Sequence, residues 1–246
     1  MPKHTDPFRS SRRKSGIEHT TFNGEPIPFL LRLKDLRKTV KDWKAFSSDH
    51  PFQVVPHSEE KLRSMRQIPI EMDPPEHTDF RTLLEPVFKR PTQTEYRLDM
   101  EAMIGGMVTD LIGVGELEIV QGFALPLQCR ALAKLLGVSE SEAEIWKGWG
   151  MHALTEGNQL EDYTAEQFRK AEQEPGSDFF SFLNQVEMKG RLLTLEEKQG
   201  IANVTFAGGK DTVINVVSSI MVYLAENEEA LGFLRQGERN IITACE

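Results

Sequence analysis

Histidine and arginine occur together in MDPPEHTDFRTLLEPVF (72–88), the first of two segments whose side chains could do chemistry. Proline is tolerated in the first turn of a helix, so the proline pair predicts a helix that continues to about residue 88. His77 and Arg81 then lie four residues apart on one face of that helix. Such a pair repels when the histidine is protonated. It suits an anion, because a guanidinium group binds a carboxylate through two hydrogen bonds.

Two other interpretations of this segment stay open. In one, the helix face is simply solvated, with Arg81 paired to Glu85 or His77 paired to Asp73. In the other, a metal ion is bound by the acidic groups and the histidine of this stretch: Asp73, Glu76, His77 and Asp79. The metal interpretation is the weaker one, because no second histidine follows at helical spacing and there is no HExxH motif.

The second segment, NVTFAGGKDTVINVVSSIMVYLAE (203–226), joins a glycine pair to an acid and an alcohol. Gly208 and Gly209 together cost a helix interior about 1–2 kcal/mol, but they let a flat ligand approach the backbone. Asp211 and Thr212 would then place a proton donor and a hydroxyl beside that ligand. The alternative is two helices, with a stop at the glycines and Asp211 capping the second helix. A phosphate-binding loop is excluded, because an acidic residue follows the Gly-Lys pair and valine replaces the leading glycine.

The two cysteines have no spacing that indicates catalysis or metal binding. Cys129, in LPLQCRALAKLLGV, falls on the apolar face of a predicted helix and is expected in the core. Cys245 is the penultimate residue, and no glycine-rich loop surrounds it. Two cysteines are too few for a disulfide framework, so a reducing, cytoplasmic location is expected.

The composition is that of a globular protein and excludes several classes of function. The 246 residues include 38 acidic and 29 basic side chains, giving a formal charge of −9. An electrostatic grip on nucleic acid by the whole protein is therefore not expected. No run of eighteen apolar residues occurs, and the first twenty residues lack a signal-peptide core. We accordingly expect neither a membrane span nor a secretory signal.

The first part of the chain is expected to contain few regular elements. Residues 1–23 are polar and basic, which predicts a frayed tail in preference to an arm for nucleic acid or lipid headgroups. The run GEPIPFLLRL (24–33) is typical of an edge strand. A helix follows from Leu33, with four apolar side chains on a face expected to be buried: Leu36, Val40, Trp43 and Phe46. Residues 50–72 predict a long loop, and Asp73 stands where the next helix needs an N-cap.

Beyond Pro91 the pattern predicts one helix after another, and the fold class is mainly α with a small β element. The predicted helices are 94–113, 125–137, 139–156, 160–172, 177–189, 194–226 and 228–236. The expected N-caps are Ser139, Ser177 and Thr194, and Thr194 forms a capping box with Glu197. The expected helix stops are Gly137 and Gly190.

Together these motifs resemble the cytochrome P450 superfamily, specifically its soluble bacterial branch. Segment 72–88 is similar to the family's C-helix signature Pro-Pro-x-His-x-x-x-Arg, and FAGGKDTV is similar to its I-helix signature. ALAKLLGVSE (131–140) resembles the stretch before the F helix, and AFSSD (45–49) the end of the B helix. The resemblance implies a tail at 1–23. It also implies a partial cytochrome P450 domain at 24–246, from about the B helix to the start of the K helix.

The resemblance also implies a cofactor, haem b, and roles for six residues. The implied haem-binding residues are His77 and Arg81 at the propionates, with Ala207 and Gly208 leaving room over the haem. The implied catalytic residues are Asp211 and Thr212, which would deliver protons during oxygen activation. The implied partners are a small apolar organic substrate, dioxygen, and a ferredoxin-like or flavin-containing electron donor. The loop at 50–72 would cover the substrate.

The sequence departs from the family in one respect. It contains neither the arginine of the K-helix Glu-x-x-Arg motif nor the cysteine loop that supplies the axial thiolate, and Cys129 and Cys245 stand elsewhere. No protein ligand to the iron is therefore expected within the chain, and we expect a truncated domain, inactive on its own. The implied function is haem-thiolate monooxygenation. The alternative is an inactive fragment that serves as a helical binding module.

Overall fold

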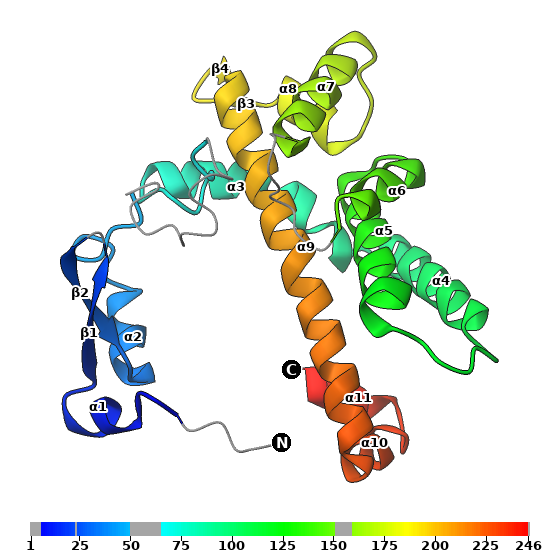
Figure 1. The fold of residues 1–246 in the computed structure, drawn as a ribbon. Coiled ribbons are helices and arrows are strands. Elements are labelled where there is room, and N and C mark those ends of the chain that lie inside the picture. Colours follow the sequence, from blue (N-terminus) through cyan, green and yellow to red (C-terminus); the bar gives the residue numbers. More distant parts are fainter. Residues whose placement is uncertain (1–5, 23, 50–64, 151–158, 246) are drawn as a thin grey trace.

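Helix α9, Leu195–Glu226, runs through the middle of the molecule, and the other helices are arranged around it (Figure 1). The computed structural model describes residues 6–22, 24–49, 65–150 and 159–245. Thr194 caps α9 by accepting a hydrogen bond from the Glu197 amide at 3.2 Å. The Glu197 carboxylate accepts one in return from the Thr194 amide at 2.7 Å. The capping box and the helix predicted over 194–226 are both confirmed, and the observed helix has 32 residues.

The remaining helices follow the predicted order with shorter bounds. They are α3 (Glu76–Phe88), α4 (Thr94–Asp110), α5 (Leu125–Leu136), α6 (Glu140–Gly148), α7 (Gln159–Gln173), α8 (Phe179–Gln185), α10 (Glu228–Leu234) and α11 (Glu238–Cys245). A 3-10 turn (Arg90–Thr92) precedes α4, and a π turn (Val120–Ala124) precedes α5. Mainly α architecture is therefore confirmed. The last helix, α11, is not among the predicted helices, although its eight residues are amphipathic.

The hydrophobic core is one cluster of buried side chains from α3, α5, α6, α7, α8 and the first half of α9, and α5 and α7 pack directly against α9. Aromatic rings fill much of it. Trp146 of α6 is fully buried and meets Phe206 of α9 edge to face, with ring centroids 5.0 Å apart. Tyr163 of α7 is 6.0 Å from Trp146 and 5.9 Å from Phe206 in the same manner. Edge-to-face contacts of this kind add to the stabilisation from burial. They fix α6 and α7 against α9.

The N-terminal lobe, residues 6–49, lies apart from this core (Figure 1). It contains α1 (Arg9–Lys14), the antiparallel pair β1 (Ile17–Phe22) and β2 (Glu25–Leu30), and α2 (Leu33–Thr39). The predicted strand is confirmed. The tail predicted for the first twenty residues is wrong over the described part, because Arg32 donates hydrogen bonds to the carbonyls of Arg12 and Lys14, each at 2.8 Å, and so secures the end of α1.

Several local predictions fail for identifiable reasons. The apolar face predicted after Leu33 is not buried, since Val40 is 77% and Phe46 54% exposed and the helix ends at Thr39. Asp73 does not cap α3. Its carboxylate accepts hydrogen bonds from the Ser47 hydroxyl and the Ser48 amide, and so links residues 47–48 to the segment before α3.

In the second half of the chain, Asp178 caps α8 in place of the predicted Ser177, because its carboxylate accepts bonds from the amides of Phe180 and Ser181. Gly190 does not end a helix. It forms the turn between β3 (Glu187–Met188) and β4 (Arg191–Leu192), where its φ of 78° favours glycine.

Two predictions remain partly or wholly outside the described residues. Helix α6 ends at Gly148, and residues 151–156 of the predicted 139–156 helix are not described. Residues 50–64 of the predicted 50–72 loop are also outside the described range. Within the part that the structure describes, no helix has the length and apolar character needed to cross a membrane.

Candidate functional site

Helix α3 turns its histidine and arginine toward α9. Phe80, Leu84 and Val87 are buried at helical spacing and anchor one face of α3 in the core. His77 and Arg81 lie on the neighbouring face, where His77 is half-buried and Arg81 is exposed. The apolar spacing of α3 thus decides which way the cationic pair points.

These two side chains line a cavity of about 300 Å³ between α3, α5 and α9. Most of its wall is apolar, and the two glycines of α9 form part of it. The lining residues are Pro69, Ile70, His77, Arg81, Leu84, Phe88, Leu132, Leu135, Val204, Thr205, Gly208 and Gly209. The structure therefore brings together the two segments that the sequence singled out 130 residues apart.

The pairings that would make His77 and Arg81 an ordinary solvated face are not formed. Glu85 instead binds Lys89, with 2.8 Å between the carboxylate and the ammonium. Asp73 accepts from Ser47 and Ser48, as described above. Neither His77 nor Arg81 makes a side-chain hydrogen bond or ion pair with a described residue. Nor do the described residues contain a cluster of three potential metal ligands, so the metal interpretation has no support.

The glycine pair lies inside a continuous helix, so the interpretation as two helices separated by a stop is wrong. A Cβ atom added to Gly208 would meet nothing within 4 Å, which means that this position faces open space. A Cβ atom added to Gly209 would come within 3.3 Å of Leu132 on α5. Gly208 therefore opens the cavity, and Gly209 permits close packing behind it.

The other three predicted site residues do not line the cavity. Ala207 is half-buried, Asp211 is half-buried, and Thr212 is exposed one turn beyond Gly208. The Thr212 hydroxyl donates to the Gly208 carbonyl oxygen at 2.6 Å. This is the bond to a preceding carbonyl that threonine commonly makes in helices, and its acceptor belongs to a cavity-lining residue.

Sequence reasoning assigned no role to Gln128 and Lys210, which hold the glycine turn from behind. Gln128 of α5 is 1% exposed and donates a hydrogen bond to the Gly209 carbonyl oxygen. Lys210 is fully buried and donates to the Trp146 carbonyl oxygen at 2.9 Å. The available signal was a single amide in LPLQCRALAKLL and a single cation in FAGGKDTV, and neither forms a recognisable pattern.

Cys129 is buried in α5, as predicted. Desolvation raises the pKa of its thiol to about 11, so the group is protonated near neutral pH. Cys245 is exposed at the end of α11. Neither cysteine is among the residues that line the cavity with His77 and Arg81.

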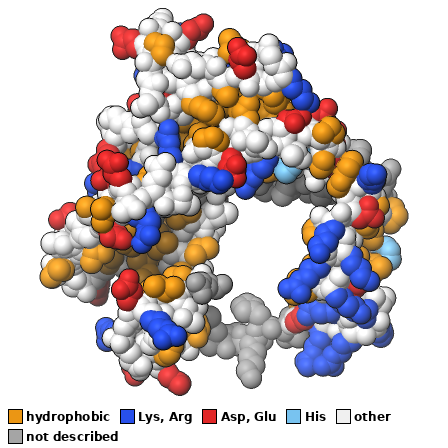
Figure 2. Space-filling model, turned by 180° about the vertical axis from the view of Figure 1, so that it is seen from behind, with side chains coloured by type: hydrophobic (Ala, Val, Ile, Leu, Met, Phe, Trp, Pro, Cys, Tyr) orange, Lys and Arg blue, Asp and Glu red, His pale blue; other side chains and the backbone are white. Residues whose placement is uncertain are grey.

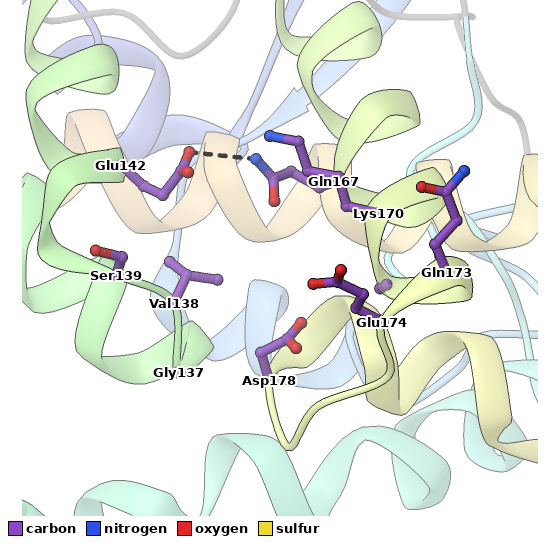
Figure 3. Close-up of a pocket in the computed structure, with 10 residues that line it drawn as sticks. Gly137, Val138, Ser139, Glu142, Gln167, Lys170, Gln173, Glu174 and Asp178 are labelled. Carbon is purple, nitrogen blue, oxygen red and sulfur yellow. Dashed lines mark hydrogen bonds between the residues drawn. The ribbon is translucent and has the colours of Figure 1, made fainter.

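A larger hollow of about 530 Å³ lies between the α5–α6 junction, α7 and the start of α8 (Figure 3). Two of its three acidic groups, Glu142 and Asp178, are engaged in structural bonds. Glu142 accepts hydrogen bonds from Tyr163 at 2.8 Å and from Gln167 at 3.2 Å, the second of which is the dashed line in Figure 3. Asp178 caps α8. These groups stabilise the junction, and we assign this hollow no chemistry.

Comparisons with known proteins give a consistent result, although no family model matches the chain. The chain is 29% identical over 237 residues to a probable cytochrome P450 127A1 from Sinorhizobium fredii, covering 92% of the chain and 56% of that protein. It is 28% identical over 228 residues to the biotin biosynthesis cytochrome P450 of Bacillus subtilis, covering 82% of the chain and 57% of the relative.

A solved structure described as a carbohydrate active P450 superposes with a TM-score of 0.87 at 44% identity, covering 94% of the chain and 62% of that structure. The chain belongs to the cytochrome P450 superfamily, whose cofactor is haem b. It spans between 56% and 62% of the length of these three relatives.

Proposed function

We propose that this chain provides the oxygen-side part of a haem-thiolate monooxygenase, which inserts one atom of dioxygen into a small organic substrate. The observation that carries the proposal is the shared cavity, in which His77 and Arg81 of α3 meet Gly208 of α9. Haem is a flat apolar ring with two carboxylates at one edge. Such a group needs apolar walls, cations at one side and a bare stretch of backbone, and this cavity has all three.

In this proposal His77 and Arg81 hold the propionate carboxylates, and the open face of Gly208 admits the ring. Haem, when bound, supplies the oxygen activation and the redox chemistry, and the protein positions substrate and protons. Asp211 exchanges protons with solvent, and Thr212 passes them on through a hydroxyl that can both donate and accept. Ala207 adjoins Gly208 and keeps side-chain bulk small on that part of α9.

The substrate class is open between two candidates. The sequence resemblance implies a small apolar molecule. The 44% identity to the carbohydrate active P450 favours a sugar or a sugar derivative instead, because the superposition covers 94% of the chain. Electrons would come from a ferredoxin-like or flavin-containing donor. Adding simple sugars and apolar compounds to the haem-loaded protein and recording the Soret shift separates the two substrate classes.

The haem site is tested by replacing its cations. Arg81→Ala removes a charge-assisted bond worth about 1.5–3 kcal/mol, so haem affinity should fall about tenfold to a hundredfold in a Soret titration. His77→Ala should weaken haem binding less. Arg97→Ala, an exposed arginine on α4, is the matched control and should leave the affinity unchanged. Equal affinity in the Arg81 variant and the wild type would show that the pair is only a solvated face.

A further inference from the structure

Lys210 is a buried cation for which the proposed chemistry has no use. Its side chain is fully buried, and its ammonium donates to the Trp146 carbonyl oxygen at 2.9 Å. Trp146 belongs to the last turn of α6, and its carbonyl oxygen also accepts a hydrogen bond from the Trp149 amide at 3.2 Å. Carbonyl groups at the C-terminal end of a helix carry partial negative charge and favour a cation. The ammonium also lies 5.5 Å from the centre of the Trp149 ring, within the range of a cation–π contact.

The surroundings of Lys210 act on its positive charge in two opposite ways. Burial lowers the pKa of the ammonium group, and the carboxylate of neighbouring Asp211 acts in the opposite direction. An apolar residue would avoid the desolvation cost at this position. A lysine does what an apolar residue cannot, because its directed hydrogen bond selects one carbonyl on the neighbouring helix.

Three contacts hold the side of this α9 turn that faces away from the cavity, and the hydrogen bond from Lys210 is the first of them. Gln128 of α5 binds the carbonyl oxygen of Gly209, the residue just before Lys210. Phe206, one turn earlier, packs edge-on against Trp146. The opposite side of this turn bears Gly208, which opens into the cavity shared with Arg81. The turn is therefore held by contacts on the side away from the cavity, and Gly208 leaves its cavity side without a side chain.

We propose that Lys210 is a positioning residue, which ties the Gly208–Thr212 turn of α9 to the last turn of α6 and so fixes where Asp211 and Thr212 stand relative to the cavity. The inference rests on the proposed function, since it assigns a purpose to the placement of that acid and alcohol. Lys210 touches neither substrate nor haem in this role. It acts indirectly, by fixing the rotation of α9 about its own axis and its position along that axis.

Lys198 offers a matched control on the same helix. Its ammonium donates to the Asn184 side chain of α8 at 2.7 Å and lies 5.3 Å from the centre of the Phe168 ring. It therefore has the same kinds of contact as Lys210, three turns away from the glycine pair. Lys198→Met removes a similar interhelical bond without touching the Gly208–Thr212 turn.

The test compares Lys210→Met with Lys198→Met by two measurements on the full chain. Hydrogen exchange should become at least tenfold faster at the amides of residues 206–213 in Lys210→Met, and it should stay unchanged there in Lys198→Met. With haem and carbon monoxide after reduction, the C–O stretching band should shift or broaden only in Lys210→Met, because that band reports the groups facing the bound gas. Lys210→Gln, neutral but polar and one bond shorter, replaces the methionine variant if that variant does not fold.

The outcomes separate this inference from the proposed function. Equal exchange in the two lysine variants, or an unaltered carbon monoxide band in Lys210→Met, would overturn the positioning role and leave haem binding untouched. Failure of the wild type to bind haem would overturn the proposed function, and hydrogen exchange alone would then decide whether Lys210 fixes the turn.

Discussion

The hydroxyl of Thr212 has a structural bond and can still take part in chemistry. It donates to the Gly208 carbonyl oxygen at 2.6 Å, so its only proton is engaged, while its oxygen keeps lone pairs that can accept. A proton relay requires a group that accepts from one side and donates to the other. The bond to Gly208 places that group one turn from the cavity.

Thr212→Val tests the relay, since valine has nearly the same shape and lacks the hydroxyl. Haem content and substrate binding should persist, while product falls and more of the consumed dioxygen leaves as hydrogen peroxide. Positioned proton transfer contributes about 10²–10⁴-fold to a rate, so the peroxide fraction should rise severalfold. The measurement is peroxide formed per dioxygen consumed in the haem-loaded protein with its electron donor.

Thr109 is the control for this variant. Its hydroxyl donates to the Gly105 carbonyl oxygen at 2.8 Å, also four residues back to a glycine, but in the exposed part of α4. Thr109→Val therefore removes the same kind of bond far from the cavity and should leave the peroxide ratio alone. If both variants behave alike, the Thr212 hydroxyl serves only the helix.

Among the elements, α9 combines the strongest helix signals with a weak point at its centre. Its capping box stabilises the first turn, and its first half is buried against α5, α6 and α7. Two adjacent glycines in its interior weaken it by about 0.5–1 kcal/mol each. Gly209 has a packing reason, the nearby Leu132, whereas no atom within 4 Å of a Cβ atom explains Gly208. A glycine without a packing reason in a cavity wall indicates a ligand.

Gly208→Leu tests that reasoning at the level of the helix. The free energy of unfolding should not fall, because leucine is the better helix former and has open space there. Haem affinity should fall at least tenfold, because the new side chain occupies the cavity. Gly105→Leu in α4, where a Cβ atom also meets nothing within 4 Å, should stabilise similarly and leave haem binding unchanged. An undiminished haem affinity in Gly208→Leu would place the ligand elsewhere.

Sequence reasoning predicted the long helices and missed several short elements, among them α1, β1 and α11. Thr194, with Glu197 three residues later, located the start of α9 because both partners of a capping box are local. The role of Asp73 could not be read in the same way, because its partners Ser47 and Ser48 lie far earlier in the chain. Asp178 is a local N-cap, but Ser177 beside it is an equally suitable residue type, so the sequence does not decide between the two. The spacing of His77 and Arg81 was enough to predict them as a pair. Gln128 could not be predicted, because a single amide forms no pattern in a sequence.

On the scale of the whole molecule, the arrangement is open. Figure 2 shows a hollow between the N-terminal lobe, where basic side chains gather, and the rest of the protein. The second half of α9 leaves apolar side chains in water, including Val216 at 57% and Tyr223 at 58% exposure. A contiguous apolar face of this kind marks a surface that packs against something. The chain covers between 56% and 62% of the lengths of three relatives. The apolar face lies on α9, the helix that carries the proposed site.

The last prediction concerns the axial ligand of haem in this 246-residue chain. A cysteine could hold the haem iron only if its sulfur reached the cavity. Cys129 does not, because it is buried in α5 and is not among the residues that line the cavity; burial also raises the pKa of its thiol. Cys245 does not either, because about 27 Å of helix separates Gly208 from the end of α9, before α10 and α11 begin. After reduction with haem and carbon monoxide, the chain should therefore give no thiolate-type Soret band. Such a band, if lost in Cys129→Ala or in Cys245→Ala, would assign the ligand to that cysteine and require a rearrangement of α5 or α11.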